Sequence, residues 1–175
     1  MAVNLGKEPQ ANLDIGPDKS EGNVTTPESL PESDLPLSAS FISLGEKTSF
    51  AEWDYTVINV EFHNVIQDSR PRGEYVVFIV EVTNNAKMSR QVSYFFELQD
   101  DQGRYFDFDS GVSLDHHQAY RTDSWHLDDI GPSFSAVMAI AFDVPNDVKR
   151  LFLYPIDMRD EDLKDTAIFL YELDN

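Results

Sequence analysis

The segment 74–84 (EYVVFIVEVTN) constrains the fold more than any other part of the chain. Side chains alternate across a β-strand, so Val76, Phe78, Val80 and Val82 would share one wholly apolar face. The opposite face would be about half apolar. The segment is rich in Val and Ile, which are stiff at χ1 and suit a pleated surface. The pattern predicts a central strand that is covered on one face and partly covered on the other.

The segments around this strand predict further strands of the same kind. Turn signals recur about every ten residues, and no long amphipathic helix is visible. One or two helical turns are expected at residues 114–120, capped by Ser113. The pattern predicts an all-β, antiparallel sandwich of about seven to nine strands. The expected strands include residues 41–44, 48–53, 55–63, 74–84, 91–99, 104–109, 134–144, 149–156 and 168–173.

Two of these segments allow inward and outward side chains to be assigned. In residues 55–63, the inward set is Thr56, Ile58, Val60 and Phe62, and the half-exposed face carries Asn59, Glu61 and His63. In residues 134–144, the inward set starts at Phe134 and runs to Val144 at every second position. The small residues between them, Ser135, Ala139 and Ala141, are expected to face outward.

Residues 1–40 differ in composition from the rest of the chain. They carry five of the nine prolines and no aromatic residue, and they show no apolar periodicity. Such a segment buries too little surface to offset the entropy of ordering. We therefore expect a disordered, acidic Pro/Ser-rich tail over residues 1–40 and the sandwich over residues 41–175.

The balance of charge bears on possible partners. The formal net charge is −19, from 32 acidic and 13 basic residues. Such a field repels nucleic acid and anionic membrane and favours cations, basic partners or a salty habitat. A solvated acidic surface without a specific role is the simpler interpretation. Cysteine is absent, which excludes disulfides, thiolate metal sites and cysteine nucleophiles.

The end of one predicted strand and the hairpin after the next carry a recognisable pattern. Its positions are Val80, Val82, Asn84, Asn85, Leu98, Asp100, Asp101, Gly103 and, one place early, Tyr105. In this pattern the chain resembles a family of telokin-like, immunoglobulin-like domains on bacterial lipoproteins and secreted proteins, including the mycobacterial immunoprotective extracellular antigen. The resemblance covers about residues 45–153, and the reversed order Gly131-Pro132 departs from the Pro-Gly turn of the family.

The resemblance implies an immunoglobulin-like sandwich that works outside the cytoplasm and has no shared catalytic residues. The tail would then be a tether to the membrane, left after removal of an export signal. The segment MAVNLGKEPQ has no apolar core, so a cytoplasmic location is the alternative. We expect a monomer or weak homodimer that binds a protein or a cell-envelope component, and not nucleic acid.

The histidine pair His116-His117 is a candidate metal site. Asp115, Asp123 and His126 lie nearby in the sequence, and imidazole with carboxylate suits zinc or copper. No HExxH spacing is present. Structural or solvent-exposed histidines are the simpler interpretation.

The aspartates around one predicted hairpin are the candidate calcium ligands. Asp100, Asp101, Asp107 and Asp109 could supply hard oxygen ligands. They do not follow the order of ligands in an EF-hand loop. We therefore expect no cofactor, and a bound calcium ion is the alternative. A second acidic run offers the same ligand type at Asp157, Asp160, Asp162 and Asp165.

The remaining residues predict no enzyme. The sequence has neither a G-x-S-x-G motif nor a phosphate-binding glycine loop. Tyr105, Tyr120 and Trp125 could line an aromatic patch or simply cap the ends of the sandwich. We therefore expect a non-enzymatic binding module. A protease inhibitor with exposed loops at residues 84–90 or 110–125 is one alternative. A metal-handling or hydrolytic protein, with His116 or His117 close to carboxylates, is another.

Overall fold

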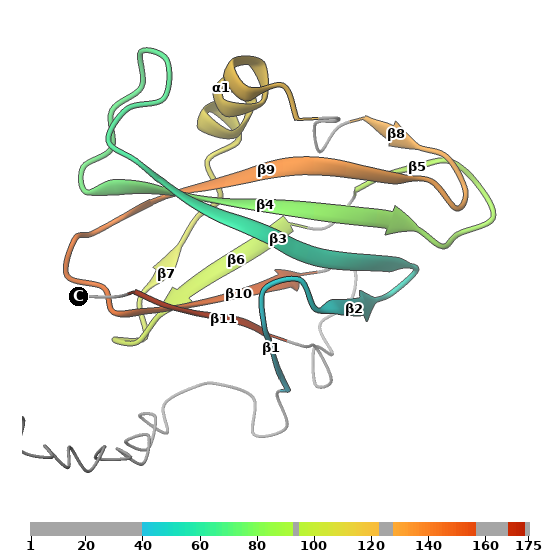
Figure 1. The fold of residues 1–175 in the computed structure, drawn as a ribbon, viewed down its shortest axis with the longest axis horizontal. Helices are drawn as coiled ribbons and strands as arrows, with labels where there is room; N and C mark the ends of the chain where they lie inside the picture. The colour runs from blue at the N-terminus through green and yellow to red at the C-terminus, as the bar shows by residue number, and fades with distance from the viewer. Residues whose placement is uncertain (1–39, 93–94, 123–127, 157–167, 174–175) are drawn as a thin grey trace, which may run out of the picture.

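The computed structural model describes residues 40–92, 95–122, 128–156 and 168–173, and shows two facing β-sheets with one helix on an outer face (Figure 1). The first sheet is antiparallel and has the order β2-β3-β4-β9. Its strands are β2 (Lys47–Phe50), β3 (Trp53–His63), β4 (Glu74–Asn84) and β9 (Ser135–Val144).

The second sheet has the order β1-β11-β10-β6-β7. Its pairs are antiparallel except for β1 and β11, which run parallel. A separate two-stranded pair joins β5 (Arg90–Gln91) to β8 (Asp129–Ile130). The strands of the second sheet are β1 (Phe41–Ile42), β6 (Phe95–Asp100), β7 (Tyr105–Phe106), β10 (Arg150–Ile156) and β11 (Ile168–Glu172).

The main core lies between the two sheets and confirms the predicted β-sandwich. Val76, Phe78, Val80 and Val82 of β4 all belong to it, as the alternation predicted. Phe78 contacts the rings of Phe142 and Phe169 edge to face. It therefore connects its neighbour β9 in the first sheet with β11 in the second sheet. The central position of β4 is confirmed as well, since it pairs with β3 on one side and β9 on the other.

The outer face of β4 and β9 is covered by the helix α1 (Ser110–Tyr120) (Figure 1). Val112 of α1 packs with Val77 of β4 and Ala141 of β9 in a second, smaller core. Ala139 and Ala141 lie on the outer face of the sheet, as predicted, but they are buried there because the helix covers that face. Phe134, expected inside, is 69% exposed because it precedes the first residue of β9.

A β-bulge changes the inward set of β3. The pairing with β4 shifts between Val57 and Asn59, so Ile58 is the extra residue. Tyr55 and Val57 face the core before the bulge, and Val60 and Phe62 pack against it afterwards. The inward assignment was therefore right for Val60 and Phe62. It was wrong for Ile58, which is 41% exposed, and for Thr56, which lies on the other face.

The helix is longer than predicted and has a different N-cap. Asp109, and not Ser113, caps it, because the Asp109 side chain accepts a hydrogen bond from the backbone N–H of Val112. Ser113 instead accepts one from the backbone N–H of Ala141 on β9. Asp109 also donates its own N–H to the carbonyl of Ala141. These bonds satisfy backbone groups of β9, an edge strand of its sheet.

The predicted strand 91–99 belongs to two different elements. β5 pairs with β8, whereas β6 enters the second sheet. The predicted tail lies outside the described residues, apart from residue 40, and so do Asp123, Trp125, His126 and the acidic run 157–165. No helix in the described part of the chain has the length and apolar character to cross a membrane.

Asn84 ties the end of β4 to the neighbouring loops. Its fully buried side chain donates to the carbonyls of Met88 and Ile130 and accepts from the N–H of Ala86. The segment 84–90 is thus anchored at its start, and residues 110–120 form a packed helix. Residues 85 and 87–89 are exposed and lie outside any strand, whereas residues 123–125 of the other segment lie outside the described residues, so the inhibitor hypothesis stays a prediction.

We predict that Asn84→Ala lowers the free energy of unfolding by about 3 kcal/mol, because it leaves buried carbonyl and amide groups without partners. The adjacent Asn85 has an exposed side chain, so Asn85→Ala should change stability by less than ~0.5 kcal/mol. Urea unfolding of both variants measures the difference. Equal stability of the two would contradict the anchoring role of Asn84.

Candidate functional site

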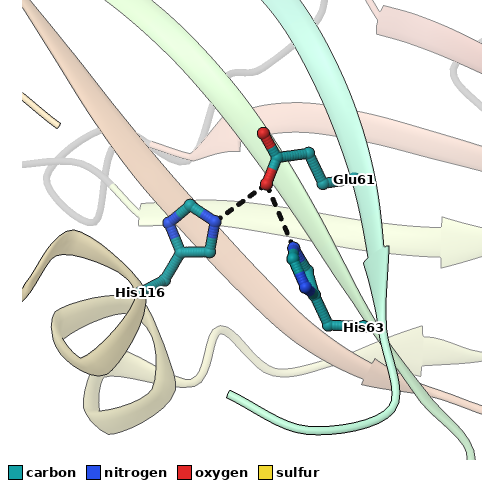
Figure 2. A group of neighbouring side chains, drawn as sticks. All are labelled: Glu61, His63 and His116. Carbon is teal, nitrogen blue, oxygen red and sulfur yellow. Dashed lines mark hydrogen bonds and ion pairs between the residues drawn. The ribbon is translucent and has the colours of Figure 1, made fainter. Parts of the chain in front are cut away.

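Two residues of β3 and one of α1 meet on the outer face of the first sheet. Glu61 lies opposite Val77 in the register, and His63 lies opposite Tyr75. The bulge at Ile58 determines this orientation, since without it Glu61 and His63 would share the core face with Tyr55 and Val57. Figure 2 shows both side chains directed toward His116, which α1 places over the sheet.

The three side chains converge on a single carboxylate oxygen. Oε2 of Glu61 lies 3.0 Å from Nε2 of His63 and 2.9 Å from Nε2 of His116. One potential ligand atom from each residue lies within 4.8 Å of the others. Within the described part of the chain, this is the one group of three or more His, Asp or Glu side chains with such spacing.

The three side chains differ in their access to solvent. His116 is only 1% exposed, whereas the His63 and Glu61 side chains are 17% and 30% exposed. Nδ1 of His116 is buried and has no hydrogen-bond partner. The cluster is therefore buried on the side of the helix and open on the side of β3.

The loop between β3 and β4 fixes the helix above the sheet. The side chain of Gln67 donates to the carbonyl of Asp115, and the Ser69 hydroxyl donates to the Asp115 carboxylate. Tyr120, in the last turn of α1, packs on both imidazoles, with ring centroids 4.4 Å from His116 and 5.4 Å from His63. The helix is thus held at Asp115, next to His116, and Tyr120 of its last turn packs on the cluster.

Of the two predicted histidines, the structure places only His116 in the cluster. Nδ1 of His117 lies 2.7 Å from the hydroxyl of Thr122 at the C-terminal end of the helix. Successive residues of a helix point in different directions, so the pair cannot chelate one ion together. Asp115, the nearby carboxylate named with them, interacts with Ser69 instead.

The electrostatics of the cluster favour a neutral imidazole beside a carboxylate. Burial lowers the pKa of His116, although the hydrogen bond to Glu61 opposes this effect. Burial raises the pKa of Glu61, but the hydrogen bonds from His116 and His63 outweigh it and leave that pKa below its ordinary value. At neutral pH, His116 is therefore a neutral imidazole and Glu61 an anion.

Because folding lowers the pKa of His116, the unfolded chain takes up a proton at a higher pH than the folded chain. Stability should therefore fall as the pH drops below about 6.5, the ordinary histidine value. We predict that the thermal midpoint, measured in EDTA, falls less between pH 7.5 and pH 5.5 in His116→Gln than in the parent chain. His117→Gln is the control and should keep the parent slope. Equal slopes in all three proteins would contradict a depressed pKa at His116.

A groove of about 660 Å³ forms a second candidate site. It lies between the β4 and β9 ends and the segment that leads from β7 into α1. The Asp143 carboxylate accepts the backbone N–H groups of Arg72 and Gly73, which fixes one wall. Its lining residues are Arg72, Gly73, Tyr105, Phe106, Asp107, Phe108, Asp109, Ser110, Asp143, Pro145 and Asn146.

Gly73 allows the two strands of this wall to approach each other closely. A Cβ atom there would lie 2.2 Å from the carbonyl oxygen of Val144. Any other residue would force the start of β4 away from the end of β9. The groove thus depends on glycine at this position.

The four hairpin aspartates are divided between different structural roles. Asp100 is buried and binds Arg104 together with the backbone N–H groups of Gln102 and Arg104. Asp101 accepts the backbone N–H of Lys149. Asp107 and Asp109 line the groove, and Asp109 also caps α1. The structure therefore does not bring the four carboxylates together as one set of ligands.

Sequence analysis missed two members of the histidine cluster. Glu61 and His63 were assigned to a half-exposed face and were not connected with His116. Their E-x-H spacing on a strand puts both on one face, which is a weak signal for a shared ligand. Contact with His116, 55 residues away from Glu61, depends on where α1 packs.

The fold and the sequence comparisons agree on the class of protein. The described residues form a β-sandwich, and residues 42–167 match the model of a domain of unknown function, DUF4352. The chain therefore belongs to the DUF4352 family, which confirms the resemblance given by its strand and hairpin residues. A search of curated proteins finds no significant match.

Two solved structures share this fold with TM-scores above 0.5, at low sequence identity. A β-sandwich protein from Clostridium difficile is 15% identical with a TM-score of 0.52, covering 82% of this chain and 99% of its own. A conserved hypothetical protein from Bacillus anthracis is 12% identical with a TM-score of 0.53, covering 65% and 88%. The secreted protein MPT63 from Mycobacterium tuberculosis is 12% identical with a TM-score of 0.48, covering 77% and 98%.

Proposed function

We propose that this chain is a non-enzymatic binding module that acts outside the cytoplasm and takes up a basic segment of a partner protein in the acidic groove. The observation that carries the proposal is the groove itself. It is large enough for several side chains, and Asp107, Asp109 and Asp143 line it. Loops at the end of a rigid sandwich are where such folds commonly bind partners.

The lining residues suit a cationic side chain. Tyr105 is 53% exposed at the groove, so its ring is accessible to a lysine or arginine by cation–π contact. The three carboxylates favour positive charge, and the net charge of −19 extends this preference over the whole chain. Arg72, whose side chain is fully exposed, sits at the rim beside Asp143.

The carboxylates of the groove also support binding over catalysis. Asp143 already accepts two backbone N–H groups, and Asp109 accepts the N–H at the start of α1. Both are therefore held as structural acceptors and are poorly placed to move a proton to and from a substrate.

The location outside the cytoplasm rests on the resemblance. Domains of this kind occur on bacterial lipoproteins and secreted proteins, and an acidic Pro/Ser-rich segment of about forty residues would serve as a tether to the envelope. We propose a peripheral protein that is monomeric or weakly dimeric and does not bind nucleic acid.

The groove can be tested by titrating the chain with a short lysine-rich peptide and measuring affinity by calorimetry. We expect the double variant Tyr105→Ala, Asp107→Asn to bind about tenfold more weakly, since it removes one aromatic face and one charge. Tyr105→Phe should retain the affinity of the parent chain, because the ring remains.

The matched control removes the same charge elsewhere. Asp68 is exposed in the loop between β3 and β4 and does not line the groove, so Asp68→Asn should change the affinity less than twofold. The proposal fails if the groove variant binds as well as the parent chain. It also fails if Asp68→Asn weakens binding to the same extent, because that result would indicate diffuse attraction to an acidic surface.

A further inference from the structure

We propose that Glu61, His63 and His116 form a binding site for one divalent transition-metal ion of the zinc type. This site uses none of the residues of the acidic groove and does not depend on the proposed binding function.

The chemistry of the donor set selects the class of metal. Two imidazole nitrogens and one carboxylate oxygen are common ligands of zinc and of neighbouring first-row metals. Calcium and magnesium prefer shells made entirely of oxygen, so they fit this set poorly. Three protein ligands leave a fourth tetrahedral position for water or for a group from outside the chain.

Two of the three separations between ligand atoms are close to those around a tetrahedral ion, and all three lie within 4.8 Å. Zinc bonds of about 2.0–2.1 Å place neighbouring ligand atoms about 3.3 Å apart. Oε2 of Glu61 lies 3.0 Å from Nε2 of His63 and 2.9 Å from Nε2 of His116. Both rings present Nε2 to the same carboxylate (Figure 2), so small outward movements of three side chains would admit the ion.

The orientation of His116 supports its role as a ligand. The residue is 1% exposed, and its polar contact is made by Nε2 with Oε2 of Glu61, on the side of the cluster. The buried ring therefore presents Nε2 to Glu61 and His63, whereas Nδ1 points away from them and has no partner among the described residues.

The surrounding structure positions the ligands before any ion binds. The bulge in β3 sets the face of Glu61 and His63, and the bonds from Gln67 and Ser69 to Asp115 hold the helix that carries His116. Such rigid support lowers the ordering cost of binding. Because the Glu61 and His63 side chains are partly exposed, an ion can reach the site from solvent.

The test is calorimetric titration of the full chain with zinc chloride, after treatment with EDTA and its removal. We expect one equivalent to bind and the thermal midpoint to rise by several degrees, reversibly with EDTA. His63→Gln and Glu61→Gln should each weaken binding more than about 100-fold, since even residues that only support a ligand cost 10–100-fold. Calcium chloride at the same concentration should leave the midpoint unchanged.

His117→Gln is the matched control, because it removes a histidine from the same helix turn but outside the cluster. It should bind zinc as the parent chain does. A long-range ¹H–¹⁵N spectrum of the histidine rings adds a readout that does not depend on stability. Zinc should shift Nε2 of His63 and His116 and leave the ring of His117 unchanged.

Because His116 is buried, His116→Gln can lose stability, so its zinc binding is followed by the same histidine spectrum. His63 is partly exposed, so His63→Gln should keep the fold and tests the site without this complication. The proposal is overturned if zinc does not bind. It is equally overturned if zinc binds with unchanged affinity to both His63→Gln and Glu61→Gln, which would place the ion elsewhere in this acidic chain. A calcium shift equal to that of zinc would also exclude the nitrogen site.

Discussion

The burial of β4 on both faces is the constraint on which the rest of the structure depends. One face carries Val76, Phe78, Val80 and Val82 and requires the second sheet as a cover. The other face carries Tyr75, Val77 and Ile79 and requires a different cover, which α1 provides. A strand with two apolar faces loses the hydrophobic stabilisation of one face if either layer is missing. The helix is therefore part of the fold and not an addition to it.

The helix in turn defines both candidate sites. Its N-terminal end, capped by Asp109, forms one wall of the acidic groove. Its middle turn carries His116 over the outer face of β3, next to Glu61. The two sites thus lie along one helix but differ in character. The groove is wide and presents carboxylates to solvent, whereas the cluster is compact and combines one carboxylate with two imidazoles.

Much of the sandwich could be predicted because strand patterns are local. The alternation in β4, the inward Val60 and Phe62 of β3 and the hairpin around Gly103 all follow from residues close in sequence. The errors arose where a tertiary contact overrides the local pattern. Ala139 and Ala141 were assigned correctly to the outer face, but the local pattern did not show that α1 covers them there. Asp109 was expected as the last residue of the strand 104–109, although it caps the helix that follows.

The sequence by itself determined the class of fold, the acidity, the family and the presence of histidine and carboxylate side chains near residue 116. Only the tertiary structure decided which of these side chains meet. A period of two puts Glu61 and His63 on the face opposite Val60 and Phe62, but it does not show what covers that face, and the bulge at Ile58 reverses the pattern for the residues before it. Contact between Glu61 and His116 spans 55 residues and exists because α1 packs across the sheet to bury Val77 and Ala141. Long-range packing of apolar surface, which no local pattern encodes, therefore places the polar groups of the candidate site.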